Sequence, residues 1–162
     1  MNNNDILIRL RYALDIKDVD MLKIFELGGN PLTRDELRTL LTKQEEDLDK
    51  DATCDLHTLE SFLNGLITFK RGKAPAKNGV EPQPTFLMTT QGNVNNVLLK
   101  KVRIALTLTS DDILDILRLA GVYASNSELS AILRKEGHRN YQICGDRYAR
   151  NFLKGLAIKY RG

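Results

Sequence analysis

Phe62-Leu63-Asn64-Gly65-Leu66 and Phe152-Leu153-Lys154-Gly155-Leu156 are nearly the same stretch of sequence, met twice at an offset of 90 residues. An upstream pair keeps a closely related register, because Arg11-Tyr12-Ala13-Leu14 falls on Arg103-Ile104-Ala105-Leu106 at an offset of 92. Self-similarity at a fixed period is typical of one folding unit used twice. The sequence therefore predicts an internal duplication, and this duplication decides the fold.

Each copy is expected to contain four α-helices. The first helix covers about residues 5–15 in copy one and 97–107 in copy two, where apolar residues recur at the spacing of one buried helical face. The fourth helix covers about residues 56–71 and 147–161 and carries the repeated Phe-Leu-x-Gly-Leu stretch. The periodicity thus indicates eight helices in all.

The second helix of each copy has a recognisable beginning and end. Asp18 and Ser110 are expected to cap its N-terminus, since short polar side chains accept hydrogen bonds from the first free amides of a helix. Gly29 and Gly121 are expected to end it, because glycine accepts the left-handed conformation that follows a helix.

Two further features recur at equivalent positions. Thr33-x-x-Glu36 and Ser125-x-x-Glu128 have the pattern of a capping box and mark the start of the third helix. Gly65 and Gly155 lie inside the fourth helix, where glycine costs about 1 kcal/mol relative to alanine. Their presence in both copies predicts a close approach of another backbone at this point.

The sequence therefore predicts an all-α fold with two tandem four-helix repeats. We expect the repeats to be related by pseudo-two-fold symmetry and to pack into one compact body, since one repeat would be marginal alone. Repeat 1 covers residues 4–72 and repeat 2 covers residues 96–162. Residues 73–95 contain three of the four prolines and form a linker, which we expect to be mobile. Its apolar residues 85–88 either dock on the body or form a brief strand.

Composition is ordinary for a globular protein, and no apolar run approaches the length of about 20 residues that spans a bilayer. The first residues, Met1-Asn2-Asn3-Asn4-Asp5, lack the features of a signal peptide. Two cysteines do not make a disulfide framework, which fits a reducing compartment. We therefore expect a cytoplasmic protein that does not interact with membranes.

The net charge of +3 hides an uneven distribution. Repeat 1 has 10 basic and 14 acidic residues, whereas repeat 2 has 12 basic and 6 acidic residues. Residues 45–53 form an acidic insertion in repeat 1, which could bind a cation weakly but lacks the spacing of an EF-hand. Charge asymmetry of this kind indicates either an interaction surface or simply two solvated faces.

The pattern Asn-x-Leu/Ile-Leu-x-x-x-Arg-x-Ala-Leu, the segment 135–144 and the Phe-Leu-x-Gly-Leu and Arg-Gly endings closely resemble the bacterial YehS-like proteins. That family carries a twice-repeated domain of unknown function. The resemblance covers both repeats, although residues 45–53 depart from it. It implies the same repeat architecture and brings no activity, cofactor or active site to this chain.

Residues that could carry catalysis or hold a metal are sparse. Among His57, His138, Cys54 and Cys144, only Cys54-x-x-His57 has a workable spacing for a metal, and copy two has Arg147 in the place of the histidine. Two buried cysteines at the starts of equivalent helices are therefore the better interpretation. A Cys54–Cys144 disulfide would require the two halves to bring them together. No nucleophile elbow or phosphate-binding loop is present. We therefore expect no enzyme activity and no cofactor.

Two polar positions recur beside the apolar faces of the first two helices. Arg11 and Arg103 border the face of the first helix, and Asp20 and Asp112 lie near the start of the second. We expect Arg11 to pair with Asp20 and Arg103 with Asp112, joining the two helices in each repeat.

The strongest candidate for a binding surface is basic. Arg147, Arg150, Lys154 and Arg161 recur at spacings that place them on one face of the last helix. The residues at their positions in repeat 1 are His57, Glu60, Asn64 and Arg71, which form no such stripe. The whole predicted basic set comprises Lys100, Lys101, Arg134, Lys135, Arg139, Arg147, Arg150, Lys154 and Arg161.

Two functions fit this pattern. The first is a non-catalytic binding or interaction module, such as a regulatory adaptor, with a protein partner or a second copy as ligand. In a self-association, the acidic repeat of one molecule would face the basic repeat of the next. The alternative is nucleic-acid binding through the basic face of repeat 2, since clustered arginine and lysine favour a phosphate backbone.

Overall fold

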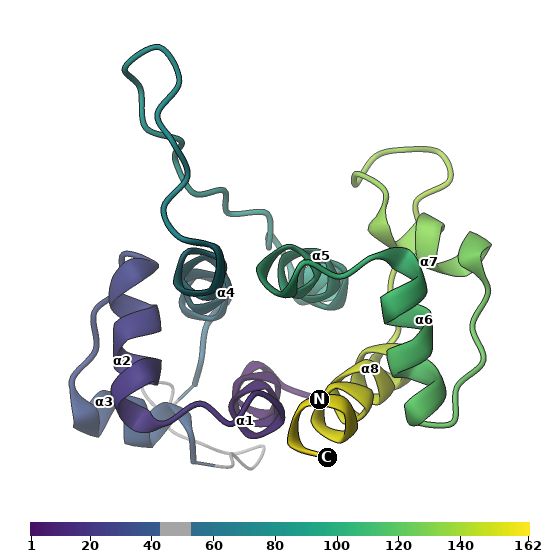
Figure 1. The fold of residues 1–162 in the computed structure, drawn as a ribbon, viewed down its shortest axis with the longest axis horizontal. Helices are drawn as coiled ribbons and strands as arrows, with labels where there is room; N and C mark the ends of the chain where they lie inside the picture. The colour runs from purple at the N-terminus through teal and green to yellow at the C-terminus, as the bar shows by residue number, and fades with distance from the viewer. Residues whose placement is uncertain (43–52) are drawn as a thin grey trace.

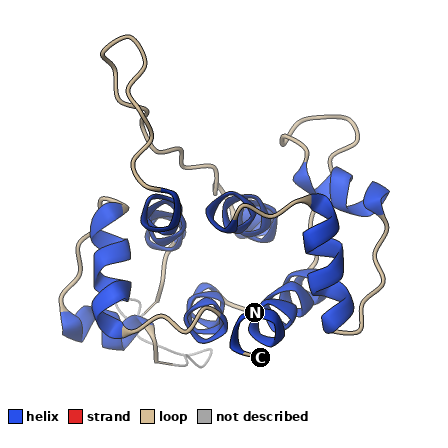
Figure 2. Cartoon of the chain, viewed as in Figure 1, coloured by secondary structure: helices blue, strands red, loops and turns tan. Residues whose placement is uncertain are grey.

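The computed structural model describes residues 1–42 and 53–162, and the acidic run at 45–51 lies outside these described residues. Over the described ranges the chain forms eight α-helices, one 3-10 helix and no strand beyond an isolated bridge between Lys77 and Val80. Figure 2 shows helices joined by loops throughout. The elements are α1 (Asn3–Ala13), α2 (Asp18–Leu27), α3 (Arg34–Leu40), α4 (Leu56–Arg71), η2 (Gln91–Asn93), α5 (Val94–Leu106), α6 (Ser110–Leu119), α7 (Asn126–Leu133) and α8 (Asp146–Arg161). The predicted all-α class is confirmed.

Four helices form the middle of the molecule and the other four flank it. In Figure 1, α1, α4, α5 and α8 lie together at the centre, with α2 and α3 on one side and α6 and α7 on the other. The two termini lie close together near α1 and α8. In the part of the chain that the structure describes, no helix is long and apolar enough to span a bilayer.

The central helices pair across the two repeats. The last helix of repeat 1, α4, packs against the first helix of repeat 2, α5, and the last helix of repeat 2, α8, packs against α1. By contrast, α1 barely contacts α4 and α5 barely contacts α8 within their own repeats. The core is one continuous apolar cluster that runs through both halves. Each repeat therefore depends on the other to cover its first and last helices.

The interior glycines lie where two backbones meet, as predicted. A Cβ atom on Gly65 would overlap the carbonyl oxygen of Ile24 in α2, and a Cβ atom on Gly155 would overlap that of Ile116 in α6. Only glycine allows α4 and α8 to approach the neighbouring helix this closely. This contact explains why glycine stands inside both helices despite its cost to helix stability.

The helix ends agree with the sequence in part. Gly29 and Gly121 have φ of 82° and 84°, so both occupy the left-handed conformation expected after a helix. The predicted N-caps of the second helices were wrong by one residue. Thr109, not Ser110, caps α6 in a complete capping box, and α2 begins after Lys17, which makes no side-chain cap bond.

The predicted capping boxes of the third helices differ between the copies. In α3 both reciprocal bonds form between Thr33 and Glu36. At the start of α7, only the bond from the Glu128 amide to the Ser125 hydroxyl is present. Both helices nevertheless begin where the pattern places them.

A pair of buried asparagines holds each repeat together at the start of its first helix. The side chain of Asn4 accepts from the Cys54 amide at 2.9 Å and donates to the Leu40 carbonyl at 3.0 Å. Asn96 makes the same two bonds, to the Cys144 amide at 2.9 Å and the Ile132 carbonyl at 3.0 Å. The preceding residues, Asn3 and Asn95, donate to the carbonyls of Cys54 and Cys144 at 3.0 and 3.1 Å.

These paired bonds anchor the segment before the last helix of each repeat to its first helix. Burial leaves the backbone groups of Cys54 and Cys144 without access to water, so the asparagines satisfy them instead.

The pseudo-two-fold relation, the mobility of the linker and the division at residues 72 and 96 stay predictions.

Candidate functional site

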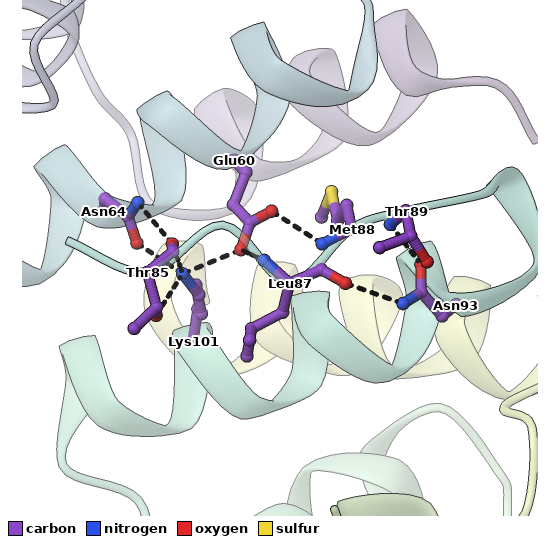
Figure 3. Close-up of polar contacts among 8 residues, drawn as sticks. All are labelled: Glu60, Asn64, Thr85, Leu87, Met88, Thr89, Asn93 and Lys101. Carbon is purple, nitrogen blue, oxygen red and sulfur yellow. Dashed lines mark hydrogen bonds and ion pairs between the residues drawn. The ribbon is translucent and has the colours of Figure 1, made fainter. Parts of the chain in front are cut away.

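A buried polar cluster joins the two repeats at the packing of α4 on α5. Glu60 of α4 and Lys101 of α5 form an ion pair of 2.8 Å, with side chains that are 1% and 4% exposed. The Lys101 ammonium also donates to the Asn64 side-chain oxygen at 2.5 Å and to the Thr85 carbonyl at 2.6 Å (Figure 3). An ammonium has three donors, and these three acceptors satisfy them.

The same cluster fixes the end of the linker. The Glu60 carboxylate accepts from the backbone amides of Leu87 at 2.7 Å and Met88 at 2.8 Å (Figure 3). Asn93 continues the contact, since its side chain donates to the Leu87 carbonyl and accepts from the Thr89 amide. Residues 85–88 thus dock on the body, which is one of the two predicted alternatives, and Met88 is buried there.

We call this cluster of Glu60, Asn64, Thr85 and Lys101, with the bound amides of Leu87 and Met88, the clasp. Its interactions are those of a structural contact and not of a reactive centre. Burial lowers the pKa of the Lys101 ammonium, while the hydrogen bond and charge of Glu60 act in the opposite direction. A nucleophilic lysine needs a free lone pair, whereas Lys101 has acceptors on every donor. A surface depression of about 600 Å³ lies beside it, lined by Asn64, Thr85, Lys101 and neighbouring residues of α2 and the linker.

Lys101 was therefore placed wrongly in the predicted basic set. Its side chain points into the clasp because residues 85–88 cover the position on α5 that helical spacing alone would leave at the surface. Lys100, its neighbour, is half-buried.

Arg161 is exposed, but its guanidinium already has partners within the protein. Its guanidinium donates to the Tyr12 carbonyl at 3.1 Å, pairs with Asp15 at 3.2 Å and lies 4.2 Å from the centre of the Tyr12 ring. These contacts tie the end of α8 to the end of α1. Arg71 of α4 makes an equivalent bond to the Ile104 carbonyl of α5 at 3.3 Å.

The remaining six residues of the predicted basic set are exposed. We call them the basic face: they lie on α8 and on the segment between α7 and α8, and none makes a hydrogen bond or ion pair of its side chain within residues 1–42 and 53–162. They are Arg134, Lys135, Arg139, Arg147, Arg150 and Lys154. The structure keeps three of them, Arg147, Arg150 and Lys154, on successive turns of α8.

The predicted ion pairs between the first and second helices were wrong in their partners. Arg11 pairs with Asp18 at 2.7 Å and not with Asp20. Arg103 donates through Nε to the Leu108 carbonyl at 3.2 Å.

Asp112 does not pair with Arg103, because its carboxylate accepts the Thr109 amide in the capping box. The Asp112 carboxylate therefore serves the N-terminal cap of α6 and not the predicted ion pair with Arg103. Hydrogen bonds from Thr109 lower the pKa of Asp112 below its usual value.

The cysteines are buried free thiols at the starts of α4 and α8, as the preferred interpretation of the sequence stated. Burial raises the pKa of both Cys54 and Cys144 to about 12, so the reactive thiolate is not formed near neutral pH. Over the described residues no three His, Cys, Asp or Glu side chains gather in a way that could hold a metal ion.

Comparison with known proteins places this chain in a family. The family described as "Protein of unknown function (DUF1456)" matches the chain twice, over residues 3–72 and 95–162. The chain belongs to this family. The two matched ranges of the DUF1456 family nearly coincide with the two copies recognised in the sequence. The chain is also similar to the "Uncharacterized protein YehS" of Escherichia coli (strain K12), with 38% identity over 159 residues, covering 98% of this chain and 96% of the relative. No solved structure matches the chain.

Membership of the DUF1456 family assigns no role to any residue, so function must be argued from the geometry. Sequence reasoning missed the two asparagine pairs and the clasp. Asn4 and Asn96 could have been found from their identity in both copies, since a polar residue retained on the apolar side of a helix signals a buried partner. Glu60 and Lys101 carry no such signal, because neither is repeated.

Proposed function

We propose that the protein is a helical binding module without a catalytic centre, which holds another macromolecule through the basic face of repeat 2. The observation that supports this function is the set of cations on α8. Arg147, Arg150 and Lys154 are exposed along one helix and make no side-chain hydrogen bond or ion pair within the described residues. Like charges on one helix face repel each other, so a ligand that brings negative charge would relieve this repulsion.

A protein partner or a second copy is the favoured ligand. Repeat 1 is acidic overall and repeat 2 basic, so copies could associate head to tail with complementary charge. Nucleic acid is the second candidate, and the observation that favours it is the continuation of the basic face beyond α8. Arg134, Lys135 and Arg139 add exposed cations from the segment between α7 and α8.

The test is a titration of two labelled polyanions, an acidic peptide and a mixed-sequence oligonucleotide, followed by fluorescence anisotropy at low and at near-physiological salt. The proposal expects at least one probe to bind, with affinity that falls as salt rises. The triple variant Arg147→Glu, Arg150→Glu and Lys154→Glu should lose this binding.

The matched control reverses three exposed basic side chains of repeat 1, with the variant Lys17→Glu, Lys23→Glu and Arg34→Glu. It changes the net charge by the same amount and should retain most of the binding. If neither probe binds the native protein, or if both triple variants lose binding equally, the basic face is not the binding surface.

A further inference from the structure

The face of α4 that binds the linker corresponds in position to a face of α8. The residues on the two faces, however, differ in charge and hydrogen-bonding capacity. On α4 three side chains contact residues 85–88 from successive turns. His57 stacks on Phe86 with ring centres 4.5 Å apart, and Glu60 accepts the amides of Leu87 and Met88. Asn64 donates to the Thr85 carbonyl at 3.0 Å. Lys101 of α5 completes this linker-binding face.

The duplicated sequence gives the equivalent residues in repeat 2. At the offset of 90 the positions of His57, Glu60 and Asn64 become those of three basic residues on α8, and at the offset of 92 the position of Lys101 becomes that of Arg9 on α1. We call these four residues the arginine face: Arg9, Arg147, Arg150 and Lys154.

The contacts of the structure support this correspondence of positions. Helix α8 packs on α1 as α4 packs on α5 (Figure 1). Arg161 of α8 donates to the Tyr12 carbonyl of α1, and Arg71 of α4 donates to the Ile104 carbonyl of α5. These two bonds join residues that are related by the same two offsets. The register of the two helix pairs is therefore the same, which places Arg9 across from Arg150 as Lys101 lies across from Glu60.

The exchange of residues reverses what the face can bind. On the linker-binding face, Glu60 accepts backbone amides and Lys101 donates to a carbonyl. On the arginine face both positions carry guanidinium groups, which only donate hydrogen bonds. All four side chains of the arginine face are exposed and make no hydrogen bond or ion pair within the described residues. A ligand there must supply acceptors and negative charge.

The nearby carboxylates form no ion pair with this face in the part of the chain that the structure describes, although the charge of Arg150 helps to lower the pKa of Asp146. Asp146 lies one turn before Arg150 on α8, but its oxygens already accept from the Asn95 side chain at 2.8 Å and the Met1 amino group at 3.1 Å. Asp5, one turn before Arg9 on α1, accepts from the Asn2 amide at the helix start. The four cations therefore remain available to a ligand.

We propose that the arginine face binds an extended acidic segment of a partner protein, laid across α8 and α1 as residues 85–88 are laid across α4 and α5. A peptide is favoured because the equivalent face holds a peptide segment, with the apolar side chain of Met88 buried and its amide bound to Glu60. The partner segment would place carboxylates on Arg150 and Arg9, where charge-assisted bidentate bonds to guanidinium are strong. This inference rests on the proposed function and names the ligand class of the same site.

The experiment uses the full chain and a labelled peptide of about ten residues that alternates glutamate with threonine, so that the carboxylates share one side when the peptide is extended. Binding is followed by fluorescence anisotropy beside a glutamine-threonine peptide and a single-stranded thymidine oligonucleotide of similar length. We expect the acidic peptide to bind more tightly than either of the other two probes.

Single variants locate the site. Arg9→Glu and Arg150→Glu should each weaken binding of the acidic peptide at least about tenfold, since each replaces an attraction with a repulsion. Arg150→Lys should retain more affinity than Arg150→Glu. Lys23→Glu is the matched control, because Lys23 is an exposed residue of α2 outside the basic face, and the same charge change there should alter affinity less than about twofold. Far-UV circular dichroism verifies that each variant is folded.

Three outcomes would overturn the inference, and they separate it from the proposed function. If the oligonucleotide binds more tightly than the acidic peptide, the partner is nucleic acid and the proposed function stands. If Arg9→Glu binds the peptide as the native protein does, the site does not extend onto α1, although the basic face can still bind. If no probe binds at low salt, the inference and the proposed function both fail.

Discussion

Glu60 and Lys101, which lie on helices from different repeats, form an ion pair of 2.8 Å that is almost completely excluded from solvent. Removing one partner strands the other charge in a buried site, at a cost of about 3–5 kcal/mol. Lys101→Ala should therefore lower the free energy of unfolding in urea by about this amount. Combining it with Glu60→Gln should cost less than the sum of the two single changes. An unfolding midpoint for Lys101→Ala equal to that of the exposed variant Lys154→Ala would show that the pair contributes nothing.

Gly155→Ala tests the close approach of α8 to α6. The added Cβ would overlap the Ile116 carbonyl oxygen, so the two helices must separate. Overpacking of this kind costs about 1–3 kcal/mol, although alanine favours a helix more than glycine does. Thermal unfolding should show a clear loss of stability, and the larger Gly155→Leu a greater one. Lys154→Ala, one residue away and exposed, is the control and should change little.

Asn96→Ala tests the anchoring of the segment before α8. The variant leaves the Cys144 amide and the Ile132 carbonyl without their buried partner. Each unsatisfied group costs about 1–3 kcal/mol. Hydrogen exchange should show the amide of Cys144 losing protection before the middle of α8 does. Unchanged protection at Cys144 would mean that the asparagine is not what holds this segment.

Asp55 makes stability depend on pH at the start of α4. Its carboxylate accepts the Thr58 amide at 2.7 Å, and hydrogen bonds from Thr58 lower the pKa of Asp55. A folded pKa below the unfolded value of about 3.9 means that the stabilisation is complete above that pH and is lost as the pH falls through the folded pKa. Asp55→Asn keeps a capping side chain and should show a smaller loss of stability on acidification. The free energy of unfolding of both proteins is measured from neutral to acidic pH. An equal loss of stability in the two proteins would show that the Asp55 carboxylate does not contribute to the pH dependence.

The two thiols report on unfolding. Burial excludes reagents from Cys54 and Cys144 and raises the pKa of each to about 12. A disulfide reagent such as Ellman's reagent, in mildly alkaline buffer, should therefore react with the native protein only as fast as the chain opens. Both thiols should react at once in concentrated guanidinium. Rapid labelling without denaturant would contradict the burial of these side chains.

Local features of this fold could be predicted from the sequence because each depends on nearby residues. Helical periodicity located the elements, and Gly29 and Gly121 ended helices where their conformational freedom was needed. Gly65 and Gly155 revealed a close contact because a glycine inside a helix is costly unless another backbone requires it.

The partners of charged side chains could not be predicted in this way. Lys101 looked like an exposed cation because nothing in its helix shows that residues 85–88 lie over it. Asp112 looked free to meet Arg103, but local capping takes its carboxylate. Arg161 shared the spacing of Arg150 and yet pairs with Asp15 of the other repeat. The errors for Lys101 and Arg161 concern contacts between segments distant in the chain, which helical spacing does not encode, whereas the error for Asp112 concerns a local capping bond that competes with the ion pair.

Because α4 packs on α5 and α8 packs on α1, both helix pairs join one repeat to the other, and this affects how the sequence can evolve. A protein made of one repeat alone would leave its first and last helices bare, and two copies of it could cover each other as a homodimer does. In that dimer every substitution would appear at both junctions at once. Joining the two units in a single chain removes this constraint, so the two junctions can come to differ, as Glu60 and Lys101 differ from Arg150 and Arg9.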